Sequence, residues 1–164
     1  LMFRFMKIIA RVLICLVSVV VWSCGSSSGS DPAPTPQPTV SQLISKSWSA
    51  SNVSWDDVAQ YSKGATTNLV SGYSQFKLDL SSTPAASLTE SDERKFTCTY
   101  TLSTDNKKIT LNGLTSSEGA PSGTNGTLEF TIVGTPSASA LSLETSTTYI
   151  KASNKKVSLS LVNP

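Results

Sequence analysis

The chain contains no histidine, and only three of its 164 residues are cysteine. Histidine is the commonest general base near neutral pH and the commonest metal ligand, so two frequent routes to catalysis and metal binding are missing. Charged residues make up only 15% of the sequence, and acidic and basic positions are interspersed. No basic tract suited to nucleic acid is visible. We therefore predict a protein that is not an enzyme, needs no cofactor or metal ion, and does not bind nucleic acid.

A long hydrophobic run is also missing. The apolar stretch 12–22 has eleven residues, with Ser18 as its one polar member, whereas a transmembrane helix needs about 20. The stretch follows basic residues and has the length of a signal-peptide core, about 7–15 residues. We expect residues 1–23 to be a signal peptide. Its removal would leave 10 basic and 11 acidic side chains, a net charge of −1.

The stretch ends in the sequence Val-Val-Trp-Ser-Cys-Gly at residues 20–25, which resembles the lipobox of bacterial lipoproteins. In that motif a small residue, here Ser23, precedes a cysteine whose sulfur receives a diacylglyceryl group. Trp22 departs from the pattern, because small side chains are usual there. The resemblance implies that Cys24 is cleaved, acylated and used as an anchor, since each buried methylene contributes about 0.8 kcal/mol. An ordinary secretory leader with an incidental Cys24 is the alternative.

The residues after Cys24 are rich in serine, glycine and then alternating proline. Such compositions form flexible coil and extended polyproline II, so we predict a tether over residues 24–39. A leader ending in Ser-Cys-Gly before a serine-rich tether resembles lipoproteins of the Bacteroidetes. The resemblance implies a lipid-anchored position in the cell envelope, at the outer membrane of a Gram-negative bacterium. The periplasmic and surface faces both stay open, with Asp31 the one acidic residue in the tether.

From residue 47 onward the apolar residues recur with a period of two. In the segment 95–102 every even-numbered residue is apolar or aromatic and every odd one is polar. This alternation predicts antiparallel strands with one buried face. Turn residues such as Asn125-Gly126 and Ser153-Asn154 separate the strands, because they favour positive φ. We expect about eight strands, at 47–55, 73–81, 94–102, 107–112, 127–133, 139–145, 147–152 and 155–162, and a longer loop at 56–72.

Short local connections make these strands an antiparallel up-and-down meander, which closes readily into a barrel that is filled or holds one small ligand. A β-sandwich is the alternative. A short helix through Val40 and Ile44 is expected before Trp48. The segment 43–48 resembles the start of lipocalin-like domains in Bacteroidetes lipoproteins, although Lys46 stands where that family has glycine. The resemblance implies an all-β, lipocalin-like barrel over residues 40–164, with Trp48 plugging one end.

Aromatic side chains on the inward faces of these strands are the candidate ligand site. Together with Trp48 they are Phe76, Phe96, Tyr100 and Phe130. The alternative is that they only fill the core, since aromatic residues dominate core burial in ordinary domains. Cys98 lies on the same face, and without a histidine to activate it we interpret it as a small hydrophobic residue.

Two clusters of acidic residues are expected to have structural roles and not to form functional sites. Asp56 and Asp57 could bind calcium or act as paired carboxylates, but we expect them to cap a short helical turn, as aspartate does at helix starts. Glu90, Asp92 and Glu93 are expected in a solvated loop before the strand at 94–102.

The sequence thus predicts a passive lipoprotein with one of two functions. In the first, a lipocalin-like domain binds a small apolar or amphipathic ligand near the membrane. In the second, a filled barrel has a structural or interaction role, and loops such as 113–126 contact another envelope protein. In both, the membrane is a partner through the lipid on Cys24.

Overall fold

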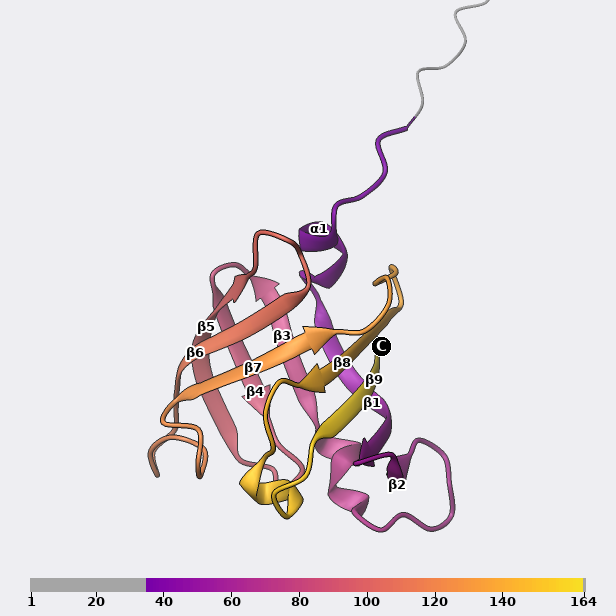
Figure 1. Ribbon diagram of the computed structural model, residues 1–164, viewed down its shortest axis with the longest axis vertical. Helices are drawn as coiled ribbons and strands as arrows, with labels where there is room; N and C mark the ends of the chain where they lie inside the picture. The colour runs from indigo at the N-terminus through magenta and orange to yellow at the C-terminus, as the bar shows by residue number, and fades with distance from the viewer. Residues whose placement is uncertain (1–34, 164) are drawn as a thin grey trace, which may run out of the picture. The chain divides into compact units, whose positions relative to one another are not determined.

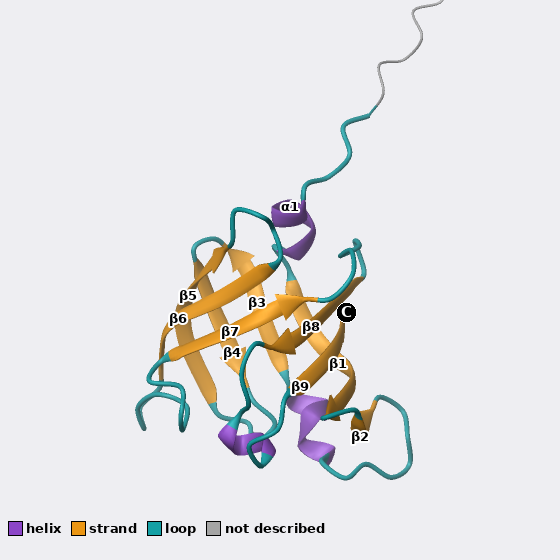
Figure 2. Ribbon diagram, viewed as in Figure 1, coloured by secondary structure: helices purple, strands orange, loops and turns teal. Residues whose placement is uncertain are grey.

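The computed structural model describes residues 35–163. The predicted signal peptide 1–23 and Cys24 lie outside the described residues, as does the tether up to residue 34. Among residues 35–163, no helix has the length and apolar character needed to cross a bilayer. The elements (Figures 1 and 2) are α1 (Val40–Ile44), β1 (Ser47–Trp55), β2 (Val58–Ser62), η1 (Ser71–Gln75), β3 (Lys77–Ser82), β4 (Ala85–Thr89), β5 (Lys95–Leu102), β6 (Lys108–Thr115), β7 (Thr127–Ile132), β8 (Ala140–Thr145), η2 (Ile150–Ala152) and β9 (Val157–Val162).

Eight of these strands form a closed barrel. From β3 to β9 each strand pairs antiparallel with the next in sequence, and β1 pairs with both β3 and β9. The sheet therefore returns to its first strand and has no open edge around this circuit. The predicted all-β, antiparallel up-and-down barrel with a short N-terminal helix is confirmed. The β-sandwich alternative is wrong because a sandwich would leave two sheets unjoined.

The remaining strand, β2, forms a hairpin with the second half of β1 and lies outside the circuit. Asp56 and Asp57 make its turn, with φ of 43° and 67°. Two successive positive φ values are those of a tight hairpin turn, so the prediction that these residues cap a helical turn is wrong. The side chain of Asn68 bonds the N–H and the C=O of Ser62, at 2.8 and 3.3 Å, and so covers part of the free edge of β2.

The strand predictions fail at five places. The strand expected at 73–81 begins only at Lys77, because residues 71–75 form the 3-10 helix η1. The segment 147–152, expected as a strand, contains the 3-10 helix η2. Strands β2 and β4 were not predicted, and β2 occupies part of the expected loop 56–72. Gly113, with φ of 68°, lies inside β6 at an irregularity in its pairing with β5, so the strand runs on past the expected end at 112.

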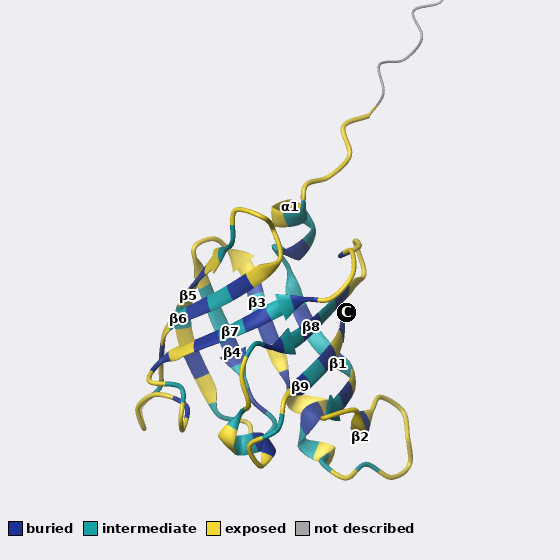
Figure 3. Cartoon of the chain, viewed as in Figure 1, coloured by how far each residue is buried: buried dark blue, intermediate teal, exposed yellow. Residues whose placement is uncertain are grey.

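The interior of the barrel holds one hydrophobic core that includes all the strands of the circuit. Buried residues alternate with intermediate or exposed ones along most strands of the circuit, which Figure 3 shows as dark blue bands between teal and yellow ones. Every residue of this core lies between Ile44 and Leu161, and the hydrogen-bonded circuit uses strands within 47–162. Residues 36–164 also form one compact unit. This domain therefore contains the interactions that its fold requires, and it can be studied by itself.

One end of the barrel, here named the closed end, is sealed beside α1. Thr39 begins this helix with a capping box that it shares with Gln42. Trp48 is fully buried and donates its indole N–H to the carbonyl of Ile44, at 2.9 Å. The hydroxyl of Tyr100 lies 3.2 Å from the Ser45 hydroxyl, which ties β5 to the end of α1. Helix and barrel therefore meet through apolar packing with a few hydrogen bonds.

Candidate functional site

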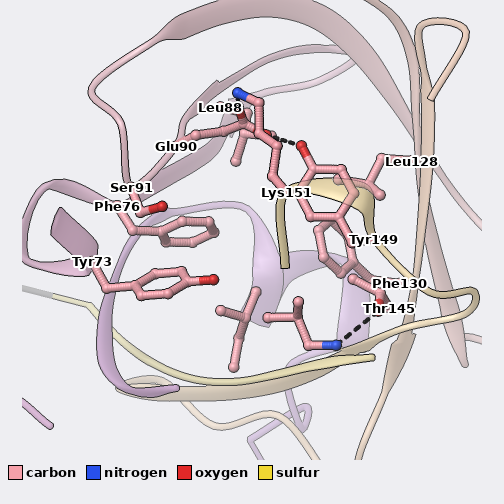
Figure 4. Close-up of a pocket in the computed structure, with 12 residues that line it drawn as sticks. Tyr73, Phe76, Leu88, Glu90, Ser91, Leu128, Phe130, Thr145, Tyr149 and Lys151 are labelled. Atoms are coloured by element: carbon pink, nitrogen blue, oxygen red, sulfur yellow. Dashed lines mark hydrogen bonds and ion pairs between the residues drawn. The ribbon is translucent and has the colours of Figure 1, made fainter. Parts of the chain in front are cut away.

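A cavity lies at the opposite end of the barrel, here named the mouth. The mouth is formed by η1, by η2 and by the β4–β5 turn at residues 90–94 (Figures 1 and 4). Alternation along the strands directs large apolar side chains into it from several sides of the barrel. The cavity lining comprises Tyr73, Phe76, Leu88, Glu90, Ser91, Leu128, Phe130, Thr145, Tyr149, Lys151, Val157 and Leu159.

Aromatic rings form two walls of this cavity. Figure 4 shows Tyr73 and Phe76 on one side and Tyr149 with Phe130 on the other. The rings of Tyr73 and Phe76 are tilted, with centroids 6.1 Å apart, within the range of favourable edge-to-face contacts. Tyr73 and Phe76 belong to η1 and its C-cap, whereas Phe130 lies on β7 and Tyr149 is the N-cap of η2. An apolar molecule between the two walls would therefore be held from opposite sides.

Tyr73 is fixed by contacts on both sides of η1. The indole N–H of Trp55 donates to its hydroxyl at 2.9 Å, and burial raises the pKa of Tyr73 above its ordinary value of 10.0. A Cβ added to the preceding residue, Gly72, would lie 1.9 Å from the carbonyl oxygen of Ser91. Only glycine therefore lets η1 pack this closely on the β4–β5 turn.

A buried carboxylate, Glu90, lies at the rim of the cavity. It is only 5% exposed, and its two oxygens accept hydrogen bonds from the Tyr149 hydroxyl and from Nζ of Lys151. Both donors belong to η2 or its N-cap. Charged side chains are seldom buried unless they are paired, so these two bonds account for the position of Glu90. They also close η2 over the mouth.

Lys151 is shared between two carboxylates. Its Nζ contacts Glu90 and also lies 2.8 Å from Asp92. Burial disfavours the charged ammonium, but hydrogen bonds to Asp92 and Glu90 outweigh burial and raise the pKa of Lys151 above 10.5. Burial likewise opposes the charged form of Asp92, and hydrogen bonds from Lys151 and from the Arg94 N–H outweigh it and lower the pKa of Asp92. Lys151 is therefore positively charged and Asp92 negatively charged at neutral pH.

Tyr149 has a different electrostatic role. Burial is the main cause that raises its pKa far above the ordinary value of 10.0, and the hydrogen bond to Glu90 and the charge of Glu90 raise it further. The phenol consequently keeps its proton and acts as a hydrogen-bond donor to the carboxylate. It cannot act as a base at neutral pH.

The cavity is small in this arrangement. The cavity volume is about 30 Å³. A single water molecule needs about 10–15 Å³ of such volume. Ligand pockets generally enclose about 300–1,000 Å³. The closed mouth therefore admits a few water molecules at most.

The five aromatic residues that the sequence indicated as a ligand site lie in three places. Phe76 and Phe130 line the cavity. Phe96 is fully buried beside it, with Nζ of Lys151 and Cζ of Arg94 each 5.6 Å from the ring centroid. Trp48 and Tyr100 lie at the closed end. The structure thus brings two of the five residues into the cavity.

Sequence reasoning missed the polar part of the site. Glu90 was expected in a solvated loop, and this prediction is wrong because the residue is buried. A signal was present, since Glu90 shares the inward face of Leu88 by the two-residue alternation of β4. Because that strand was not predicted, Glu90 could not be assigned to its inward face. Tyr149 and Lys151 lay in the segment wrongly expected as a strand, and no local pattern indicated their partner.

The other candidate groups lie away from the cavity. Asp56 accepts a hydrogen bond from the Lys156 N–H at 3.0 Å and pairs with Lys155 at 3.2 Å, which ties the β1–β2 turn to the start of β9. Cys98 is half-buried, and burial raises its pKa to about 11, so the reactive thiolate is scarce. In the described part of the chain, no three Cys, Asp or Glu side chains come together as metal ligands would.

Comparisons with known proteins add little to this geometry. No family model matches the chain, and no curated protein matches it significantly. Among solved structures, a lipocalin-like protein from Bacteroides uniformis is similar to it, with a TM-score of 0.43 and 14% identity. The alignment covers 74% of this chain and 99% of the other.

Proposed function

We propose that the chain is a lipid-anchored binding protein of the cell envelope, whose barrel takes up a small apolar or amphipathic molecule at the mouth. One observation carries the proposal: an apolar cavity with aromatic walls ends at a buried, hydrogen-bonded carboxylate. Apolar surface with a few converging polar groups is the general form of small-molecule sites. Binding without catalysis is the proposed activity, because Tyr149 and Lys151 hold their protons and no histidine is present.

Entry of the ligand requires η2 to move, and the contacts that hold η2 to the barrel rim allow such a movement. The element is three residues long, and Ile150 at its start is 54% exposed. Its side-chain hydrogen bonds to the barrel rim are those of Tyr149 and Lys151 to Glu90 and Asp92. Polar contacts can be exchanged for contacts to water or ligand at little net cost, whereas a buried apolar contact cannot. The mouth is therefore the end of the barrel that we expect to open.

The proposal is tested with the isolated domain, residues 36–164, and three probes that share one alkyl chain. Octanol, octylammonium and octanoate are titrated separately, each below its micelle concentration, while backbone amide signals are followed by NMR. We expect at least one probe to shift the amides of Ser91, Tyr149 and Lys151 in a saturable way. Amides at the closed end, such as that of Ser45, should not move.

A matched pair of variants tests whether the probe binds at the mouth. Ser91→Trp puts a large side chain at the cavity rim, and Ser139→Trp puts it on an exposed residue in the β7–β8 connection at the closed end. Binding should be lost in the first variant and kept in the second. If no probe binds the mouth of the unmodified domain, the binding function is wrong.

The second function remains the alternative, and the small cavity volume is the observation that favours it. A barrel that stays closed would have a structural or interaction role, with loop 113–126 as the contact to another envelope protein. Failure of all three probes, together with absence of any small molecule when the protein is purified from its host and examined by native mass spectrometry, would favour this alternative.

The anchor is tested separately. Cys24→Ala should leave the protein unprocessed by the lipoprotein signal peptidase and without incorporated palmitate, because the diacylglyceryl group is attached through sulfur. Cys98→Ala is the matched control, since Cys98 lies on β5 inside the domain, and it should label normally. Palmitate labelling of the Cys24→Ala protein would show that the lipobox interpretation is wrong.

A further inference from the structure

We propose that the ligand of the mouth carries a cation, and that this cation takes the place of Lys151 Nζ on the buried carboxylate of Glu90. The inference rests on the proposed function and narrows its ligand class to apolar molecules with a protonated amine or a similar cationic head. It follows from three features of the mouth: its balance of charge, the second partner of Lys151, and the aromatic walls.

The mouth has more negative than positive charge. Glu90 and Asp92 share the single ammonium of Lys151. Arg94, whose charge also acts on Asp92, is paired with Glu118 at 2.7 Å and is absent from the cavity lining. Glu90, Asp92 and Lys151 together thus have a formal net charge of −1. A negative site of low exposure attracts cations and repels anions.

Lys151 can leave Glu90 without losing its own ion pair. Asp92 is 45% exposed and Lys151 is 23% exposed, whereas the Glu90 side chain is 6% exposed. An outward movement of η2 therefore keeps Lys151 near Asp92, in a better hydrated position. Glu90 is then left with one free oxygen at the cavity rim, still held on the other oxygen by Tyr149 or by water.

That free oxygen determines which ligand is favoured. A buried carboxylate that has lost its cation carries a large desolvation penalty. A ligand with a cationic head removes the penalty, a neutral ligand leaves it, and an anionic ligand adds repulsion. The aromatic walls act in the same direction, because the ring faces of Tyr73, Phe76 and Tyr149 attract a cation at close range.

The experiment compares the affinities of the three octyl probes for the domain of residues 36–164, measured by calorimetry at neutral pH. We expect octylammonium to bind about tenfold more tightly than octanol, and octanoate to bind more weakly than octanol. Equal affinity for the three probes, or a preference for octanoate, would overturn the cation assignment and leave the proposed binding function standing. No binding of any probe would overturn both.

Two variants assign the preference to Glu90. Glu90→Gln keeps the shape of the side chain and should lower octylammonium affinity about tenfold, to that of octanol. Glu118→Gln is the control, because that carboxylate is 72% exposed and pairs with Arg94 outside the cavity, and it should keep the preference. A Glu90→Gln protein that retains the full preference would contradict the assignment.

A third variant covers the case in which Glu90→Gln does not fold. Lys151→Met removes the internal cation that competes with the ligand, and it also removes a bond that closes η2, so octylammonium affinity should rise, and rise more than octanol affinity. Unchanged or weaker octylammonium binding to folded Lys151→Met would show that Lys151 and the ligand do not share the Glu90 site.

Discussion

The two ends of the barrel are closed by different kinds of interaction. At the closed end, the fully buried Trp48 packs beside Ile44 under α1. At the mouth, Glu90, Tyr149 and Lys151 hold η2 through hydrogen bonds and ion pairs above an apolar cavity. An apolar seal loses most of its stabilisation when it opens, because its surface returns to water. Polar groups exchange partners with water, so the mouth opens at lower cost.

The closed end therefore contributes mainly to stability, and the mouth is the end that we propose binds the ligand. Regions that open locally have few buried apolar contacts, and binding elements are drawn from them. In this barrel η2 contributes only the small residue Ala152 to the core, whereas α1 contributes Ile44 and the start of β1 contributes Trp48. The predictions below compare the two ends, each measured in the domain of residues 36–164.

The largest effect is expected at the closed end. Trp48→Ala should lower the free energy of unfolding by about 3–5 kcal/mol, because it removes a large buried side chain and leaves a cavity. Urea unfolding measures the change. Trp55→Ala, on the same strand but half-buried at the mouth, should cost clearly less. Equal losses from the two substitutions would mean that the ends do not differ in this way.

The next largest effect concerns the packing of η1 on the β4–β5 turn. Gly72→Ala should cost about 1–3 kcal/mol, because its Cβ would meet the Ser91 backbone and force the two segments apart. Amide hydrogen exchange in residues 90–94 should become faster as well. Ser71→Ala, an exposed position in the same helix, is the control and should change neither quantity. Normal exchange in the Gly72→Ala protein would show that the contact does not hold the mouth.

A smaller effect is expected from the polar closure itself. Tyr149→Phe removes the hydroxyl that donates to Glu90 and should cost about 1 kcal/mol in thermal or urea unfolding. The matched control is Tyr61→Phe. Tyr149 is half-buried and Tyr61 is buried, but the Tyr61 hydroxyl has no hydrogen-bond partner among the described residues, so the cost should be smaller. If the two variants are equally stable, the Tyr149–Glu90 bond does not stabilise the closed mouth.

The smallest effect is the pH dependence of the Asp92–Lys151 pair. The pKa of Asp92 is lowered in the folded protein from 3.8, so its ionised form stabilises the fold above that pH. This stabilisation is lost as the pH falls through the folded value. Asp92→Asn should therefore be less stable than the unmodified domain at neutral pH, by at most about 1 kcal/mol because the pair is partly exposed.

The difference between Asp92→Asn and the unmodified domain should disappear in acid, below the folded pKa of Asp92. Urea unfolding over a series of pH values tests this, and the Lys151→Met background is the control. There the Asp92→Asn effect should shrink, because its main partner is absent. An effect of the same size at every pH would contradict the role of the charge.

Much of the barrel could be predicted because its signals are local. The alternation in β5 places Phe96 and Tyr100 inward whatever the rest of the chain does, and both are buried. The strand β4 carries a weaker signal, since Leu88 is its only large apolar residue. Small residues in such a strand fit several structures equally well. The prediction failed there, and the inward direction of Glu90 was lost with it.

The strand faces, most of the turns and the helix at the entrance to the domain follow from the amino-acid order, because each depends on residues a few positions apart. The pairing of β1 with β9 and the paired carboxylate at the mouth arise only when the chain has folded. Tyr149 and Lys151 lie 59 and 61 residues from Glu90 along the chain. No local pattern links side chains at that distance. Closure of the barrel brings them to one end, and the burial that follows makes their pairing necessary.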